Sequence, residues 1–105
     1  MKISVLFICL GNICRSPTAQ GLFQYYVDQA NLADSILVDS AGTGSWHEGE
    51  APDSRAQLVA LNKGYDISHL RGRSVENNDF LSFDYMLAMD DQNLYFLENM
   101  KPDNY

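Results

Sequence analysis

Three short apolar runs divide the sequence, and each is followed by small or polar residues. The runs are Ile3 to Ile8, Ile36 to Asp39 and about Phe83 to Met89. Runs of this length, bounded by turn-forming residues, are typical of strands, and the first is apolar at nearly every position, as a buried strand requires. The pattern therefore predicts three strands.

The segment after the first run has apolar residues at helical spacing. Ser16 and Pro17 open this helix, because a proline in the first turn loses no hydrogen bond there. The spacing predicts that one face of the helix packs on the core. The expected members of that face are Ala19, Leu22, Phe23, Tyr26 and Ala30.

Two further helices are predicted along the chain. A Gly-rich loop from Gly42 to Gly49 leads to a helix from about Pro52 to Lys63, which Gly64 ends just beyond its last turn. The last helix runs through Leu97, with Asp90 as its N-cap. Helices that alternate with strands predict an α/β fold around a parallel sheet.

A cysteine and an arginine separated by five residues lie between the first strand and the first helix. The segment reads Cys9, Leu10, Gly11, Asn12, Ile13, Cys14, Arg15 and Ser16. The N–H groups of such a loop and of the following helix N-terminus form an anion site, and a glycine allows close backbone approach. The local sequence therefore predicts a phosphate cradle.

Three side chains of this motif carry the expected chemistry. The N–H dipoles and the Arg15 guanidinium favour the thiolate form of Cys9, which is the expected nucleophile. Arg15 holds two phosphate oxygens with its planar fork and stabilises their charge in the transition state. Ser16 is placed to donate its hydroxyl to the sulfur, which eases departure of the thiolate. The pattern predicts a phosphatase that works through a phosphocysteine.

Cys14 has two interpretations, and the sequence leaves both open. It is either an ordinary buried residue or the partner that captures an oxidised Cys9 in a disulfide. The two cysteines lack the C-x2-C spacing of a zinc site, and no spacing of Asp84, Asp90 and Asp91 supports a metal site. We expect no metal and no cofactor.

The chain resembles the low-molecular-weight protein tyrosine phosphatases. Its segment VLFICLGNICRSPTAQ looks like the signature of that family, and the resemblance runs from Met1 to about Leu97. Four further segments share it: Val38–Thr43, Pro52–Arg55, Ile67–His69 and Phe83–Asp90. The resemblance implies a doubly wound, three-layer α/β fold with a flavodoxin-like parallel sheet in the order 2-1-3-4, of which strand 4 is missing here. Residues 1–105 are then one phosphatase domain, truncated at its C-terminal end.

The resemblance also implies roles for residues in and around the loop. The substrate-binding residues are Leu10, Gly11, Asn12, Ile13, Cys14 and Trp46. Trp46 is expected to stack on a phosphotyrosine ring, although an aromatic residue buried beneath its own loop is the other interpretation. Ser40 and His69 are expected to brace the loop by hydrogen bonds to Asn12 and Ser16. The resemblance places Asp90 near the arginine, in addition to its expected role as a helix cap.

The family carries an Asp-Pro-Tyr or Asp-Pro-Trp loop whose Asp protonates the leaving phenol, and this sequence contains no such motif. Asp103 and Tyr105 directly follow the last predicted helix, whereas the family's acid comes after a further helix and strand. We therefore expect Asp103 to be a solvated tail residue. The general acid is expected to lie outside residues 1–105.

Composition narrows the range of partners. The net charge of −7 argues against nucleic acid and anionic membranes, and no apolar run is long enough for a transmembrane or targeting segment. Two cysteines without a disulfide framework suit a reducing cytoplasm. The expected ligands are phosphotyrosine proteins or small aryl phosphates, with phosphate or sulfate in the loop.

The sequence thus predicts a protein tyrosine phosphatase, and two alternatives remain. An arsenate reductase shares the fold and loop, but it needs redox cysteines beyond the loop, and none follows Cys14. A non-catalytic oxyanion or phosphotyrosine binder is consistent with the missing acid.

Loss of strand 4 leaves Phe83 to Met89 as an edge strand with apolar residues on both faces, and this predicts self-association.

Overall fold

The computed structural model describes residues 2–103. Its sheet has three parallel strands in the order β2-β1-β3, formed by β1 (Ile3–Cys9), β2 (Ile36–Gly42) and β3 (Tyr85–Ala88). This order confirms the predicted doubly wound α/β fold. The first two strands extend to Cys9 and Gly42, beyond their predicted ends at Ile8 and Asp39, and the third is shorter than the predicted Phe83 to Met89.

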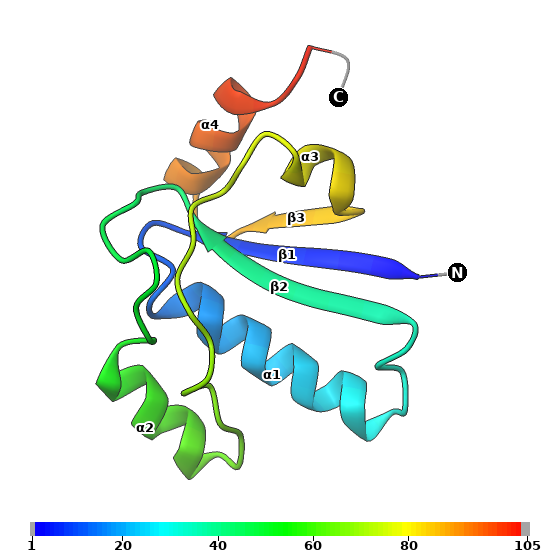
Figure 1. The fold of residues 1–105 in the computed structure, drawn as a ribbon, viewed down its shortest axis with the longest axis vertical. Helices are drawn as coiled ribbons and strands as arrows, with labels where there is room; N and C mark the ends of the chain where they lie inside the picture. Colours follow the sequence, from blue (N-terminus) through cyan, green and yellow to red (C-terminus); the bar gives the residue numbers. More distant parts are fainter. Residues whose placement is uncertain (1, 104–105) are drawn as a thin grey trace.

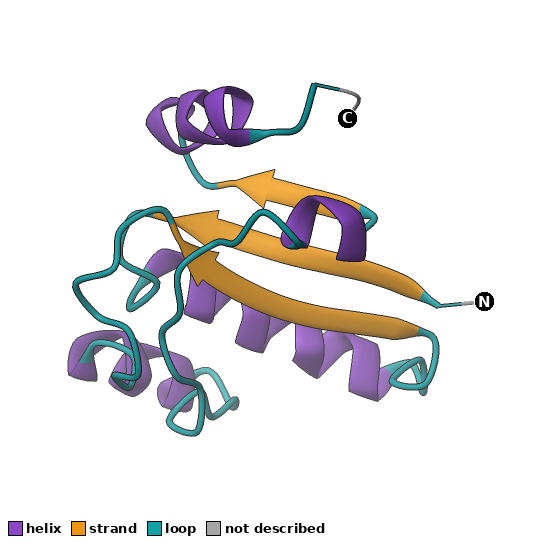
Figure 2. Cartoon of the chain, turned by 45° about the horizontal axis from the view of Figure 1, so that its top comes forward, coloured by secondary structure: helices purple, strands orange, loops and turns teal. Residues whose placement is uncertain are grey.

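Helices cover both faces of the sheet. Figures 1 and 2 show α1 (Arg15–Gln29) and α2 (Ser54–Asn62) on one side and α3 (Asp79–Ser82) and α4 (Asp91–Met100) on the other. The layers are those of the predicted three-layer fold. No helix of residues 2–103 combines the length and the apolar character needed to cross a membrane.

Side-chain caps set the starts of two helices. The carboxylate of Asp53 accepts a hydrogen bond from the backbone N–H of Arg55 at 2.8 Å, so Asp53 is the N-cap of α2. The helix therefore begins at Ser54 and not at about Pro52, as predicted. Asp90 accepts from the N–H of Asn93 at 2.8 Å, which confirms it as the N-cap of α4. The short helix α3 was not predicted, because four residues are too few to show helical spacing.

The predicted core face of α1 is wrong. Tyr26 is 60% exposed, and Leu22 and Ala30 are exposed as well. The buried residues of the helix are Ser16, Pro17 and Val27. Polar side chains occupy much of the face that meets the sheet, so hydropathy does not identify it. Of the expected residues, Phe23 reaches the sheet, where its ring packs edge-on against Phe7 with centroids 5.9 Å apart.

A cluster of buried side chains lies between the sheet and the helices α3 and α4. Its members are Leu6, Ile8, Ala41, Val75, Phe80 and Leu97. On the opposite face, Ile67 is fully buried against α1, where a Cβ at Gly21 would meet its Cγ2 at 2.3 Å. The central strand β1 is therefore covered on both sides, and its carboxyl end is held firmly in place.

The third strand is covered on one face only. Tyr85 and Leu87 stand opposite Val5 and Phe7 in the parallel register, so they share the face on which α1 packs. They are 57% and 43% exposed, because α1 lies over β1 and β2. Within residues 2–103, β3 pairs with β1 alone. We call Tyr85 and Leu87 with this unpaired edge the β3 flank.

Candidate active site

The predicted phosphate loop lies between the carboxyl end of β1 and the start of α1. Helix α1 begins at Arg15 without a side-chain cap, so the N–H groups of its first turn remain available to an anion. Asn12 has φ of +57°, in the left-handed region that asparagine tolerates better than most residues. Its backbone N–H therefore turns into the loop, where it lies 3.3 Å from the sulfur of Cys9.

Cys9 is buried at the base of this loop and is 4% exposed. Its Sγ lies 2.9 Å from the hydroxyl oxygen of Ser16, which is fully buried. Since Ser16 Oγ accepts a hydrogen bond from the side-chain amide of Asn12 at 2.8 Å, its hydroxyl proton is directed to the sulfur. Two donors thus point at Cys9 Sγ.

The amide group of Asn12 is the centre of a buried hydrogen-bond network. Its Nδ2 donates to Ser16 Oγ and, at 2.9 Å, to Ser40 Oγ, and its Oδ1 accepts from the backbone N–H of Arg73 at 3.0 Å. Ser40 in turn donates to Gln20 Oε1 at 2.6 Å. Both N–H donors and the carbonyl oxygen of the amide are in use, so the network permits one orientation of Asn12.

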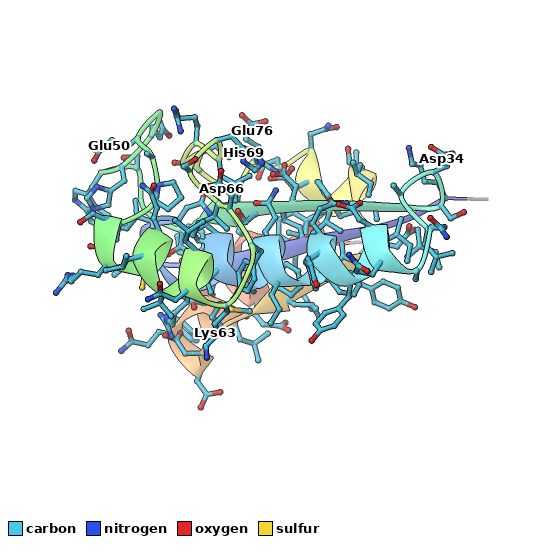
Figure 3. All side chains as sticks on the ribbon, turned by 90° about the horizontal axis from the view of Figure 1, so that it is seen from below. Asp34, Glu50, Lys63, Asp66, His69 and Glu76 are labelled. Carbon is cyan, nitrogen blue, oxygen red and sulfur yellow. The ribbon has the colours of Figure 1, made fainter. Side chains whose placement is uncertain are left out.

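The structure brings Asn12, Ser16 and Ser40 together as expected, but His69 is not among them. His69 is exposed on the loop after α2, beside Asp66 (Figure 3), and its side chain makes no hydrogen bond within residues 2–103. It lines a cavity of about 350 Å³ that also contains Gln20 and Asp66. The acceptor oxygen of Asn12 is instead satisfied by a backbone N–H, that of Arg73.

Arg15 and Asp90 form an ion pair beside the loop. The Nη2 atom of Arg15 lies 2.9 Å from Oδ2 of Asp90, and both side chains are partly exposed. The hydrogen bond from the N–H of Asn93 lowers the pKa of Asp90, and the one from Arg15 lowers it further. Asp90 is therefore a carboxylate that holds the guanidinium at the carboxyl end of the sheet.

Trp46 and His47 form one wall of the loop's opening. They line a cavity of about 270 Å³ together with Cys9, Leu10, Gly11, Ile13, Cys14 and Arg15. Trp46 is 68% exposed, so it is not buried beneath its own loop. The imidazole of His47 packs close to the loop, because a Cβ at Gly11 would meet its Cδ2 at 3.0 Å. An aromatic ring attached to a bound phosphate would have Trp46 beside it.

Cys14 is exposed, so the interpretation of this residue as part of the core is wrong. It lines the loop's opening and also an apolar groove of about 590 Å³ between α1 and α2, which continues to Val59 and Met89. Both cysteines are unpaired thiols. Among residues 2–103, no three His, Cys, Asp or Glu side chains form a group that could hold a metal ion.

Two carboxylates border the site, and both are held ionised. Asp90 pairs with Arg15, and Asp53, in the apolar groove, pairs with Arg55 at 3.2 Å. The side-chain hydrogen bond from Arg55 and the bond from its backbone N–H lower the pKa of Asp53. Asp103 is exposed beyond the end of α4. The ten residues of that helix, about 15 Å long, separate it from Asp90. Asn104 and Tyr105 lie outside the described residues.

Three residues that the structure brings to the site were not predicted: Gln20, His47 and Arg73. Arg73 is 61 positions from the side chain that its N–H contacts, and no local spacing indicates such a pair. Gln20 is polar and lies outside the apolar positions predicted for α1, so hydropathy gave no signal of its contact with Ser40.

Comparison with known proteins identifies the family of the chain. The family model "Low molecular weight phosphotyrosine protein phosphatase" matches residues 4–104. A protein of that name from Schizosaccharomyces pombe is 46% identical over 102 residues, covering 96% of this chain and 65% of the relative. Among solved structures, a protein tyrosine phosphatase from Entamoeba histolytica with Hepes in the active site superposes with a TM-score of 0.94 at 41% identity, over 99% of this chain and 66% of that one.

A second solved structure similar to this chain is named as an arginine phosphatase and not as a tyrosine phosphatase. The drosophila arginine phosphatase DARP has a TM-score of 0.87 and 43% identity, over 95% of this chain and 61% of that one. The chain thus spans about two thirds or less of the length of each of these three proteins.

Proposed function

Because the chain belongs to the low molecular weight phosphotyrosine protein phosphatase family, we propose that it supplies the nucleophile and the phosphate cradle of a phosphotyrosine phosphatase. The observation that carries the proposal is the position of Cys9 Sγ, which faces the hydroxyl of Ser16 at 2.9 Å and the N–H of Asn12 at 3.3 Å. A buried sulfur with two directed donors is suited to react as a thiolate.

The reaction has two displacements at phosphorus. In the first, the sulfur of Cys9 forms a bond to phosphorus while the bond to the phenolic oxygen breaks, and the departing oxygen takes up a proton. In the second, water attacks phosphorus and the sulfur leaves as a thiolate, which the Ser16 hydroxyl stabilises. Arg15 and the loop N–H groups hold the phosphoryl oxygens throughout.

The proton for the leaving group is supplied from outside residues 1–105 in this proposal. A general acid works best when its pKa is near the working pH. The pKa values of both Asp53 and Asp90 are lowered by their hydrogen-bond partners, so neither carboxyl group carries a proton to donate at neutral pH. Asp103 lies a helix length from the loop.

The substrates are phosphotyrosine proteins or small aryl phosphates, with phosphate or sulfate as simple occupants of the loop. The exposed ring of Trp46 at the opening supports an aromatic leaving group. The similarity to DARP makes a phosphoarginine peptide a necessary comparison substrate. Two unpaired thiols, one of them exposed, favour the cytoplasm as the compartment.

The chain by itself is also expected to self-associate through the β3 flank. An edge strand with unpaired N–H and C=O groups beside exposed Tyr85 and Leu87 offers both backbone partners and apolar area to a second copy.

Turnover by the purified 105-residue chain tests the proposal. We expect slow release of phosphate from an activated aryl phosphate, whose leaving group needs little protonation, and none from the variant Cys9→Ser, which controls for contaminating phosphatases. Hydrolysis of phosphotyrosine peptides should be weaker by about 10²–10⁴, the usual contribution of acid-base assistance.

Other results would contradict parts of the proposal. Equal rates on aryl phosphate and phosphotyrosine peptide would mean that the acid lies within residues 1–105. A preference for phosphoarginine peptides would replace the substrate class. Arsenate reduction, or phosphate binding without any Cys9-dependent turnover, would favour the reductase or the non-catalytic binder instead.

A further inference from the structure

We propose that Arg73 is a positioning residue, which holds the phosphate loop in its binding conformation through Asn12. This inference rests on the proposed function of the loop and deepens it. Arg73 lies in the connection between α2 and α3, outside the loop motif and outside the strand ends where such residues are expected. Its backbone and its side chain contact different parts of the molecule.

The backbone of Arg73 joins the loop to the end of β2. Its N–H donates to Asn12 Oδ1 at 3.0 Å, while its carbonyl oxygen accepts from the N–H of Gly42 at 2.8 Å. The N–H of Val75 donates to the carbonyl of Gly42, also at 2.8 Å. Residues 73–75 thus lie along the carboxyl end of β2, and the N–H of Arg73 faces Asn12.

The guanidinium group of Arg73 anchors this segment at two points. Its Nη1 and Nη2 atoms pair with the two oxygens of Asp79, at the start of α3, at 3.0 and 3.1 Å. Its Nε and Nη2 atoms lie 3.2 and 3.1 Å from Oδ2 of Asp39 on β2. The side chains of Arg73 and Asp79 are 31% and 8% exposed, so this pair is largely shielded from water, whereas the side chain of Asp39 is 40% exposed. The geometry of these contacts needs the planar fork of an arginine.

Asn12 is the residue that needs such support. Its left-handed φ of +57° turns its N–H toward Cys9 Sγ, and its amide orients the hydroxyls of Ser16 and Ser40. If the N–H of Arg73 moves away, Asn12 Oδ1 loses its donor among residues 2–103, and the amide is held only by its Nδ2 bonds to Ser16 and Ser40. The hydroxyl of Ser16, which faces the sulfur, is then oriented less firmly. The chain of contact runs from Asp39 and Asp79 through Arg73 to Asn12 and Cys9.

The first test replaces the fork and keeps the charge. We expect Arg73→Lys to weaken protection of Cys9 by inorganic phosphate against iodoacetamide about tenfold, the low end of the effect of outer-shell hydrogen-bond partners. Alkylation of Cys9 at neutral pH should slow. The matched control is Arg71→Lys, because the hydrogen bonds that exposed Arg71 makes within residues 2–103 go to the backbone carbonyls of Ser68 and Leu70. Arg71→Lys should leave both readouts unchanged.

A second variant guards against simple loss of folding. Removing Arg73 alone leaves the buried carboxylate of Asp79 unpaired, which is strongly destabilising. The double variant Arg73→Met with Asp79→Asn removes both charges of that pair. Thermal melts set a temperature at which every variant is folded. A lower melting temperature with a wild-type alkylation profile and wild-type phosphate protection would overturn the inference, because it would reduce Arg73 to a structural role.

A double-mutant cycle tests whether Arg73 acts through Asn12. In an Asn12→Ala background, Arg73→Lys should have little further effect on phosphate protection, whereas independent residues give multiplicative effects. Multiplicative effects would contradict the proposed route.

The inference also has a readout that needs no phosphate and no turnover. The Asn12 side-chain amide should exchange its protons slowly in the wild type and rapidly in Arg73→Lys, as observed by NMR with selectively labelled asparagine. Slow exchange in both proteins would overturn the inference and leave the proposed function intact. A wild-type Cys9 that phosphate fails to protect would overturn the proposed function, while the exchange result still decides the role of Arg73.

Discussion

The phosphate loop and the β3 flank belong to one small sheet, but they differ in how far their groups are buried and hydrogen-bonded. Around the loop, the side chains of Cys9, Asn12, Ser16 and Ser40 are all buried, and each has hydrogen-bond partners. Along the β3 flank, Tyr85 and Leu87 are apolar and exposed beside an unpaired strand edge.

The difference follows from where the partners of each region lie in the sequence. The loop finds its first partners within residues 9–16, and its side chains also contact Ser40, Arg73 and Asp90 from farther away. Its carbonyls accept from the N–H groups of Thr43, Gly44 and Asp53. A strand edge and an apolar sheet face need a whole additional element as cover. The chemistry of this fold is therefore organised more locally than the stability of its sheet, and the two should respond differently to mutation.

The largest expected effect is that of Arg15→Lys on the loop. A lysine retains the positive charge but loses the two parallel hydrogen bonds to phosphoryl oxygens, so we expect turnover of an activated aryl phosphate to fall about 10²–10³-fold. Steady-state kinetics measure this, with Arg71→Lys as the control that removes an equivalent fork elsewhere. The melting temperature should stay close to that of the wild type, because Arg15 is half exposed. A similar loss in both variants would remove the special role of Arg15.

Leu87→Lys addresses the other region. A charge on the exposed face of β3 should reduce self-association, because edge pairing would then bury a lysine. Sedimentation velocity or light scattering measures the effect at matched concentrations. Leu81→Lys is the control, since Leu81 is still more exposed but lies on α3, on the opposite side of the sheet. If Leu81→Lys alone disperses the chain, or if the wild type is a cooperative monomer, the β3 flank is not the contact.

The contrast between the two regions also accounts for what could be predicted from the sequence. The loop was predictable because a nucleophile, a glycine, an arginine and a helix start rarely occur together by chance within eight residues. The strands and the cap Asp90 were predictable from local signals of the same kind. The contacts of Arg73 were not, because the residues that it joins are far apart in sequence and pair by shape and charge.

The prediction of the core face of α1 was wrong for a related reason. Hydropathy assumes that the buried side of a helix is apolar, yet Ser16 and Gln20 face the sheet and use their polar atoms in the network around Asn12. The apolar residues Leu22 and Tyr26 are exposed on the other side. A polar network beneath an active site reverses the usual pattern in the helix that carries it.

The smallest expected effect concerns Asp90 and pH. Its folded pKa is lowered, first by the N–H of Asn93 and then by Arg15, so its charge stabilises the fold above the ordinary carboxyl pKa, and this contribution disappears as the pH falls through the lowered value. Asp90→Asn keeps an N-cap and removes the charge. Its melting temperature should lie slightly below that of the wild type at neutral pH and converge with it in acid.

Asp91→Asn is the control for this pH dependence, because Asp91 is also in the first turn of α4 but does not contact Arg15. A pH-independent difference for Asp90→Asn, or an identical profile in both variants, would show that the pair with Arg15 contributes nothing.

The most direct test of the phosphate cradle compares the two cysteines in one protein. Cys9 is 4% exposed and Cys14 is exposed, so accessibility alone predicts that iodoacetamide modifies Cys14 first. A thiolate held by Ser16 and Asn12 predicts the reverse: at neutral pH, peptide mapping should find Cys9 alkylated faster than Cys14 and faster than in the unfolded chain, with protection by phosphate. Preferential alkylation of Cys14, with Cys9 no faster than in the unfolded chain and insensitive to phosphate, would contradict the proposed site.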